Sequence, residues 1–193
     1  MIAIIDYGNG NLSSVKNAFD FVNADSKITS TAEEIKAAEK VVFPGVGSFG
    51  YTMKKVKEKK LENTINEVIT TGKPFLGICL GLQVLFEESE ESPGMKGLGV
   101  FEGKVVKFRN GKVPQVGWNN IVSTKKEIIQ NGFAYFVNSY YAIPKDNNIV
   151  LAKTNYFGEF ASAIQRDNVI AVQFHPEKSG EFGLNFLERW SKC

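Results

Sequence analysis

The sequence contains few of the residues that metal sites and disulfide frameworks need. Among 193 residues there is one histidine, His175, and there are two cysteines, Cys79 and Cys193. Two cysteines do not make a disulfide framework, and a single histidine excludes a multi-histidine zinc site. We therefore expect no metal and no cofactor. We also expect that any catalytic imidazole is that of His175.

Charge and hydropathy exclude further classes of protein. The net charge is only +2 at pH 7, which gives no indication of nucleic-acid or membrane-surface binding. No apolar run approaches the roughly 20 residues of a membrane-spanning helix. The first residues, MIAIIDYGNG, lack a basic segment, so we interpret them as a strand rather than a targeting signal. A free thiol without such a signal is typical of the cytoplasm, where we expect the protein to be.

The composition is that of an ordinary soluble globular protein, with 43% hydrophobic and 23% charged residues. In the first half, short apolar runs alternate with segments of helical periodicity, which predicts an α/β fold with a mainly parallel central sheet flanked by helices. Strands are expected at 2–5, 26–29, 41–43 and 74–78, and helices at 12–22, 31–39 and 53–69, the last with a break near 59–60.

The pattern changes after Glu91, where glycines separate short β-like runs. This spacing predicts an antiparallel, β-rich second half that closes with an amphipathic helix at 181–192, although Gly183 is unfavourable in a helix. No low-complexity linker separates the halves, so we expect one domain, residues 1–193. The strands expected in the second half lie at 104–108, 118–122, 135–137, 149–154, 160–165 and 169–173.

Cys79 stands between two glycines in G-I-C-L-G, at 77–81. An apolar run precedes it and an amphipathic segment at 82–88, expected to be helical, follows. Strand, sharp turn and helix with the nucleophile at the turn is the thiol version of a nucleophile elbow. The backbone N–H of Leu80, at the helix start, is then directed at a developing oxyanion. The alternative interpretation is a buried cysteine that packs as a small hydrophobe.

His175 follows an expected strand and lies two residues before Glu177. In an extended chain the two side chains face the same way, and Pro176 between them favours that conformation for His175. A carboxylate beside an imidazole holds its tautomer and stabilises the imidazolium. A surface His-Pro-Glu turn is the alternative, but with Cys79 the pair completes a Cys-His-Glu triad.

A glycine-rich loop, P-G-V-G-S-F-G at 44–50, follows another expected strand. Sites in parallel sheets lie beyond the carboxyl ends of the strands, where this loop and Cys79 both fall. Its glycines let backbone N–H groups approach a substrate closely, so the loop is a candidate for the second oxyanion donor.

Taken together, the motifs resemble the class I, triad-type glutamine amidotransferase family, and more narrowly the glutaminase subunits of imidazole glycerol phosphate synthases. The resemblance implies a flavodoxin-like fold and hydrolysis of L-glutamine to glutamate and ammonia. It also implies a heterodimer with a (β/α)8-barrel cyclase subunit, which uses the ammonia to make imidazole glycerol phosphate and AICAR in histidine biosynthesis. The motifs are G-I-C-L-G-L-Q (77–83), Q-F-H-P-E-K-S (173–179), I-I-D-Y-G-N-G-N-L (4–12), P-G-V-G-S-F (44–49), V-P-Q-V-G-W-N (113–119) and Y-F-V-N-S-Y (135–140).

The resemblance also implies a role for each matching residue. Cys79 is the implied nucleophile, His175 the acid and base, and Glu177 the residue that orients His175. The implied oxyanion donors are the N–H groups of Gly47 and Leu80. The residues implied to contact glutamine are Gly45, Gln83, Asn138, Ser139 and Tyr140, and those implied to face the cyclase are Gln115 and Trp118.

One position departs from the family pattern. The family usually reads Y-F-V-H-S-Y, and Asn138 stands here in place of the histidine. An asparagine side chain forms hydrogen bonds but does not take up or release a proton near neutral pH, so we assign Asn138 no acid–base role. The difference leaves a paralogous glutaminase subunit, which supplies ammonia for amidination of a bacterial surface sugar, as an alternative. A non-catalytic subunit with an inert triad is a second alternative.

Overall fold

The structure of residues 1–193, a computed structural model, is built on a nine-stranded sheet with the order β2-β1-β3-β4-β12-β11-β10-β7-β8. The first five strands in this order are parallel. They are short, and all but the edge strand β2 are almost completely buried, which is typical of parallel strands covered on both faces. Their bounds are β2 Ser26–Thr29, β1 Ile2–Ile5, β3 Lys40–Gly45, β4 Phe75–Cys79 and β12 Val169–Val172.

The other strands of the large sheet belong to the second half of the chain and are antiparallel. A smaller sheet of order β5-β6-β9 lies beside the large one, and its β5 and β6 are parallel. The predicted α/β fold with an antiparallel second half is confirmed. The bounds are β5 Phe86–Ser89, β6 Phe101–Lys107, β7 Gln115–Ser123, β8 Gly132–Asn138, β9 Tyr140–Pro144, β10 Val150–Asn155 and β11 Glu159–Arg166.

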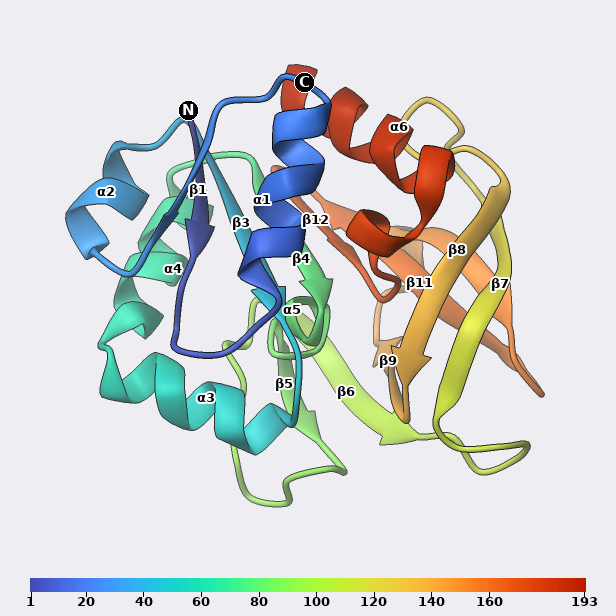
Figure 1. The fold of residues 1–193 in the computed structure, drawn as a ribbon. Coiled ribbons are helices and arrows are strands. Elements are labelled where there is room, and N and C mark those ends of the chain that lie inside the picture. The colour runs from blue at the N-terminus through green and yellow to red at the C-terminus, as the bar shows by residue number, and fades with distance from the viewer.

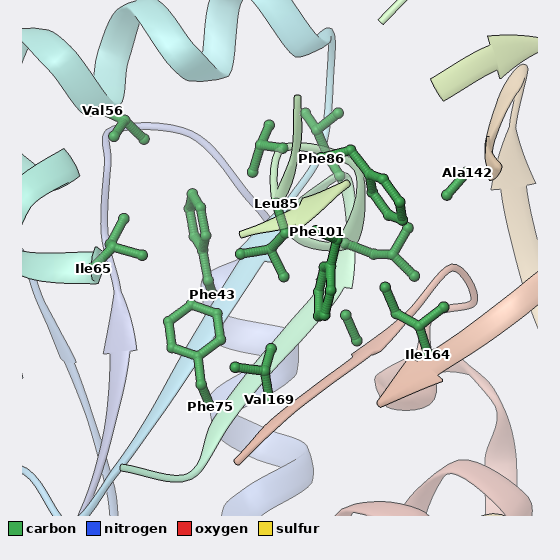
Figure 2. Packing of buried hydrophobic residues seen from close by; sticks show 14 of the residues in the cluster. Phe43, Val56, Ile65, Phe75, Leu85, Phe86, Phe101, Ala142, Ile164 and Val169 are labelled. Carbon is green, nitrogen blue, oxygen red and sulfur yellow. The ribbon is translucent and has the colours of Figure 1, made fainter. Parts of the chain in front are cut away.

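Helices cover both faces of the parallel strands (Figure 1). Because successive strand residues point to opposite faces, Phe43 and Phe75 pack toward one layer of helices and Val42 and Leu76 toward the other. Figure 2 shows the first of these cores, in which Phe43 and Phe75 lie with residues of α3, α4 and the small sheet. One layer holds α2 Ala32–Ala37, α3 Phe49–Glu58 and α4 Leu61–Thr70, and the other holds α1 Leu12–Phe21 and α6 Gly180–Lys192.

None of these helices combines the length and the apolar character that are needed to cross a bilayer. The expected break in the helix at 53–69 is also present. Lys60 adopts a left-handed backbone with φ 56°, which ends α3 and starts α4.

The prediction of a helix at 82–88 is wrong. Only one turn forms, α5 Leu80–Gln83, and the chain then enters β5. The carbonyl groups that would continue the helix accept hydrogen bonds from another segment instead. Leu98 N–H donates to Val84 and Phe101 N–H donates to Leu85. Because all the apolar side chains of this segment are buried, its composition was compatible with either a helix or a strand.

Gly183 lies inside α6, where a glycine weakens a helix, and the structure shows why it is there. A Cβ atom at this position would collide with the carbonyl of Pro176. The helix therefore packs directly against the short 3-10 turn η2 Pro176–Lys178, which follows β12.

We predict that Gly183→Ala lowers the free energy of unfolding by about 1–3 kcal/mol, because the added methyl group overpacks this contact. In an open helix the same change would be stabilising by about 1 kcal/mol. Asn185→Ala, on the exposed side of α6, is the control and is expected to be neutral or stabilising. Urea denaturation followed by circular dichroism measures both variants. Equal stability would show that α6 can shift away from Pro176.

Candidate active site

Cys79 is held in a strained backbone conformation at the end of β4, with φ 55° and ψ −105°. This is rare for a residue with a side chain and is typical of sites that present a reactive group. The flanking glycines make the turn possible. A Cβ at Gly77 would come within 2.8 Å of the Gly81 carbonyl oxygen, and one at Gly81 would collide with the Phe43 carbonyl. The predicted elbow is therefore present, although the helix after it is a single turn.

The strand that carries His175 is the parallel neighbour of β4. Val172 pairs with Ile78, so the segment after β12 runs beside the elbow. Two hydrogen bonds, one to β8 and one to Ser179, fix the backbone of His175. Its N–H donates to the carbonyl of Tyr135 (2.9 Å), and its carbonyl accepts from the hydroxyl of Ser179 (2.6 Å).

His175 and Glu177 form a buried pair. The Nδ1 atom of His175 lies 2.8 Å from Oε1 of Glu177, and the two side chains are 4% and 2% exposed. Burial by itself lowers the pKa of His175, but the negative charges of Cys79 and Glu177 outweigh it and raise the pKa from 6.5 to about 10. At neutral pH the imidazole is therefore protonated, which is the form that can donate a proton to a leaving amine.

The loop that follows β3 lies beside the elbow, because Gly45 pairs with Cys79. Tyr7 and Asn9, from the β1–α1 loop, bind the backbone of the next residue, Val46. The N–H of Val46 donates to the hydroxyl of Tyr7 (3.4 Å), and the carbonyl of Val46 accepts from Nδ2 of Asn9 (3.0 Å). Gly47 follows with φ +97°, and its N–H donates to no other group of the chain. Of the groups in this loop, the Gly47 N–H is therefore available to a ligand.

These elements surround a cavity of about 310 Å³. Most of the residues expected at the site line it, so the tertiary structure brings together segments that are far apart in the sequence. Sequence reasoning missed five lining residues, of which Glu91 and Lys178 are charged. The residues that line the cavity are Val46, Gly47, Cys79, Leu80, Gln83, Glu91, Pro114, Val137, Asn138, Ser139, Tyr140, His175 and Lys178.

Sequence reasoning also missed a buried glutamine, Gln173, which lies beside the thiol of Cys79. Gln173 has no exposed surface, and its Nε2 lies 3.6 Å from Sγ of Cys79. Its Oε1 accepts a hydrogen bond from Nε2 of Gln83 (3.0 Å). Its place in the Q-F-H-P-E segment was the available signal, but in a strand of apolar residues a glutamine could equally have pointed away from the site.

Two expected residues are placed differently from the expectation. Gly45 does not line the cavity. A Cβ at this position would come within 2.8 Å of the Leu80 Cβ, so Gly45 allows β3 to pack against the elbow. Gln115 is only 3% exposed, because its side chain points to the core side of β7 beside Asn138, so it is not on a surface that a partner can reach. Trp118, by contrast, is 57% exposed, which excludes the alternative of a core tryptophan.

A thiol on an elbow, a histidine paired with a buried carboxylate and a free N–H at one end of a parallel sheet are the groups that hydrolases of the cysteine-triad class use. Known proteins agree with this class. The family model described as glutamine amidotransferase class-I matches residues 3–191. A solved structure described as a glutamine amidotransferase covers both chains fully with a TM-score of 0.81 at 18% identity. The PurLQS structure from Thermotoga maritima has a TM-score of 0.76 at 16% identity and covers 98% of this chain and 93% of its own.

Relatives with higher sequence identity indicate a narrower group within this class. Imidazole glycerol phosphate synthase subunit HisH of Methanothermobacter thermautotrophicus is 49% identical over an alignment of 195 positions, which covers 98% of this chain and 97% of the relative. The HisH subunit of Thermococcus kodakarensis is also 49% identical, with both chains covered in full. The chain belongs to the class-I glutamine amidotransferase family, and it is an enzyme, as the sequence predicted.

We predict that Cys79→Gly is more stable than Cys79→Ala by about 1–2 kcal/mol, because only glycine relieves the strain of a positive φ. Both variants lack the thiol, so their difference reports the backbone. At Val116, an exposed β7 residue outside the positive-φ region, the same pair of substitutions should rank in the opposite order. Chemical denaturation measures all four variants. A more stable alanine at position 79 would contradict the assignment of strain.

A second prediction concerns pH. The folded-state pKa of His175 lies above the unfolded value, so the imidazolium stabilises the fold fully below pH 6.5, and this contribution is lost as the pH rises through about 10. Between these values the free energy of unfolding should fall more steeply for the wild type than for His175→Gln. Cys79→Ala should reduce the slope in part, because the charge at Cys79 is the largest contribution that raises the pKa. Parallel slopes in urea titrations of all three proteins would refute the pairing.

Proposed function

We propose that the chain is the glutaminase subunit of an imidazole glycerol phosphate synthase, in which Cys79, His175 and Glu177 hydrolyse L-glutamine to glutamate and ammonia. The observation that supports this assignment most directly is the buried His175–Glu177 pair beside the elbow thiol. The relatives at 43–49% identity carry the name of this subunit over nearly their whole length. We include all of residues 1–193 in one amidotransferase domain, since the buried core joins the large sheet to the small one.

The cavity suits a free amino acid. Glu91 is the one carboxylate among its lining residues, and we assign it to the α-ammonium group of glutamine. One Glu91 oxygen already accepts the N–H of Phe49 (2.6 Å), which fixes the carboxylate at the wall. Ser139 donates neither its N–H nor its hydroxyl to any other group, so both are available to the α-carboxylate. Gln83, Asn138 and Tyr140 complete this part of the wall.

We propose the following reaction for these residues. The Cys79 thiolate attacks the side-chain carbonyl carbon of glutamine, and a C–S bond forms while the carbonyl electrons move to oxygen. The N–H groups of Gly47 and Leu80 stabilise that oxyanion. His175 then gives its proton to the nitrogen as the C–N bond breaks and ammonia leaves. Water, deprotonated by His175, hydrolyses the glutamyl thioester, which releases glutamate and returns the proton to the Cys79–His175 pair.

The ammonia must reach a second active site, and we propose a (β/α)8-barrel cyclase subunit as the partner that receives it. The outer face of the β7–β8 hairpin supports this proposal, because it exposes a group of apolar side chains, which is typical of interaction sites. Val137 belongs to this group and also lines the cavity, so the apolar face reaches the rim of the active site. The exposed apolar residues of the hairpin are Val116, Trp118, Val122, Phe133 and Val137.

We also propose a cytoplasmic location, because a thiol nucleophile must stay reduced and the cytoplasm keeps thiols reduced. The free Cys79 has no second cysteine near it, since Cys193 lies at the exposed end of α6.

We predict that Cys79→Ala lowers ammonia release from glutamine by roughly 10⁴-fold or more, in the complex with the cyclase and its ligand. Cys193→Ala is the matched control and should keep full activity, because Cys193 is remote from the cavity. Glutamate and ammonia are measured in the same samples. Full activity of Cys79→Ala would refute the nucleophile, and a wild-type complex that a glutamine-analogue electrophile does not label would favour the non-catalytic alternative.

The partner is tested separately. Co-expressed with a histidine-pathway cyclase subunit, the chain should co-purify with it and support formation of imidazole glycerol phosphate from glutamine. Trp118→Glu, on the exposed hairpin face, should weaken co-purification while Cys79 remains reactive. Failure to bind this cyclase, together with binding to a sugar-amidinating partner, would favour the paralogous function that the Asn138 substitution left open.

A further inference from the structure

Three side-chain amide and thiol groups form a chain of hydrogen bonds under the cavity. Gln83 Nε2 donates to the backbone carbonyl of Tyr140 (3.0 Å) and also to Oε1 of Gln173 (3.0 Å). Gln173 Nε2 then faces Sγ of Cys79 at 3.6 Å. Gln173 is completely buried between Val172 and Phe174, so no solvent competes for these bonds.

The direction of this chain is determined by a group that cannot be reversed. A backbone carbonyl only accepts hydrogen bonds, so the atom of Gln83 that meets Tyr140 is the NH₂ group. The same NH₂ group meets Gln173, so the atom of Gln173 that receives it is the oxygen. The remaining atom of Gln173, its NH₂ group, must then point at the sulfur of Cys79.

We propose that Gln173 is a further catalytic residue, which donates a hydrogen bond to the Cys79 thiolate and so increases the fraction of the thiol that is ready to attack. The proposal rests on the assignment of Cys79 as the nucleophile. A hydrogen bond to an ionised group is stronger than one to a neutral group, so the donor favours the thiolate over the thiol. When the C–S bond of the thioester forms, the sulfur loses its charge and this hydrogen bond weakens.

A purely structural role does not account for the position. A fully buried amide costs free energy unless its polar atoms are paired, and the residues of β12 that precede Gln173 are all apolar. Both polar atoms of Gln173 are paired, one with a residue that lines the cavity and one with the nucleophile. The same chain uses both N–H groups of Gln83, so its Oε1 is left to accept from a donor of the substrate.

Other titratable groups surround the sulfur and must be held constant in any test. His175 with Glu177 behind it, Tyr7 from the β1–α1 loop, and Glu91 and Lys178 in the cavity wall all face this region. Gln173→Met leaves all five unchanged and adds no charge, so a shift in the titration of the thiol in that variant reports the amide.

The test uses two variants that separate the two hydrogen bonds of Gln173. Gln173→Met removes both, and Gln173→Glu keeps the acceptor for Gln83 but removes the donor to sulfur. Gln165→Met, on the neighbouring β11, is the matched control. All are made in a Cys193→Ser background, and the rate of Cys79 alkylation by iodoacetamide is measured against pH without glutamine. Circular dichroism first establishes that each variant is folded.

We expect the midpoint of the alkylation profile to move upward by about one to two pH units in Gln173→Met. It should move upward at least as far in Gln173→Glu and stay unchanged in Gln165→Met. In ammonia-release assays of the complex with the cyclase, kcat/KM should fall for both Gln173 variants. KM should rise more for Gln173→Met, because only that variant frees the amide of Gln83.

An unchanged alkylation midpoint in either folded Gln173 variant would overturn the proposal. If Gln173→Met does not fold, Gln173→Leu, which also lacks the donor and adds no charge, takes its place, because a shift in Gln173→Glu combines loss of the donor with repulsion of the thiolate by the new carboxylate. Alkylation reports the thiol and requires no turnover, so a chain with shifted midpoints but no ammonia release would refute the proposed glutaminase function while leaving the hydrogen bond to sulfur intact.

Discussion

The strained backbone at Cys79 is the constraint on which the rest of the site depends. A residue with φ 55° persists only when its surroundings hold it there. Here β3 and β12 enclose β4 on both sides, and glycines on either side of Cys79 let the chain turn against the Phe43 carbonyl. The same close packing determines the positions of the other functional groups. It brings the Gly45–Gly47 segment from one neighbouring strand and His175 from the other to a single point.

Charge at the site is balanced within a small buried volume. The carboxylate of Glu177 has almost no exposed surface, and its partner His175 is equally buried. Burial of such a pair is costly unless the charges meet, and here the imidazolium lies between the carboxylate and the nucleophile. Gln173 adds a neutral donor to the sulfur without adding charge. In the proposed mechanism, one imidazolium and one amide together favour the thiolate of Cys79.

The second half of the chain supplies part of the cavity wall and also the exposed apolar face of the β7–β8 hairpin. In β8, inward residues such as Asn138 face the cavity region, while Phe133 and Val137 point outward. This alternation follows from the two-residue period of a strand. Because Val137 belongs to the exposed face and also lines the cavity, a partner that covers the hairpin would lie close to the place where ammonia is released.

Local pattern in the sequence was enough to predict much of this protein. The alternation of strands and helices, the G-x-C-x-G elbow and the single histidine before Pro176 and Glu177 are all short-range features, and local backbone preferences determine them. The length of the helix after Cys79 was not predictable, because Leu98 and Phe101, far along the chain, take over the carbonyls that would have continued it. Burial of Gln115 and the contact of Gln173 with Cys79 were also decided only by tertiary structure. The direction in which a polar side chain points depends on which strands pair, and strand pairing joins residues that are distant in the sequence.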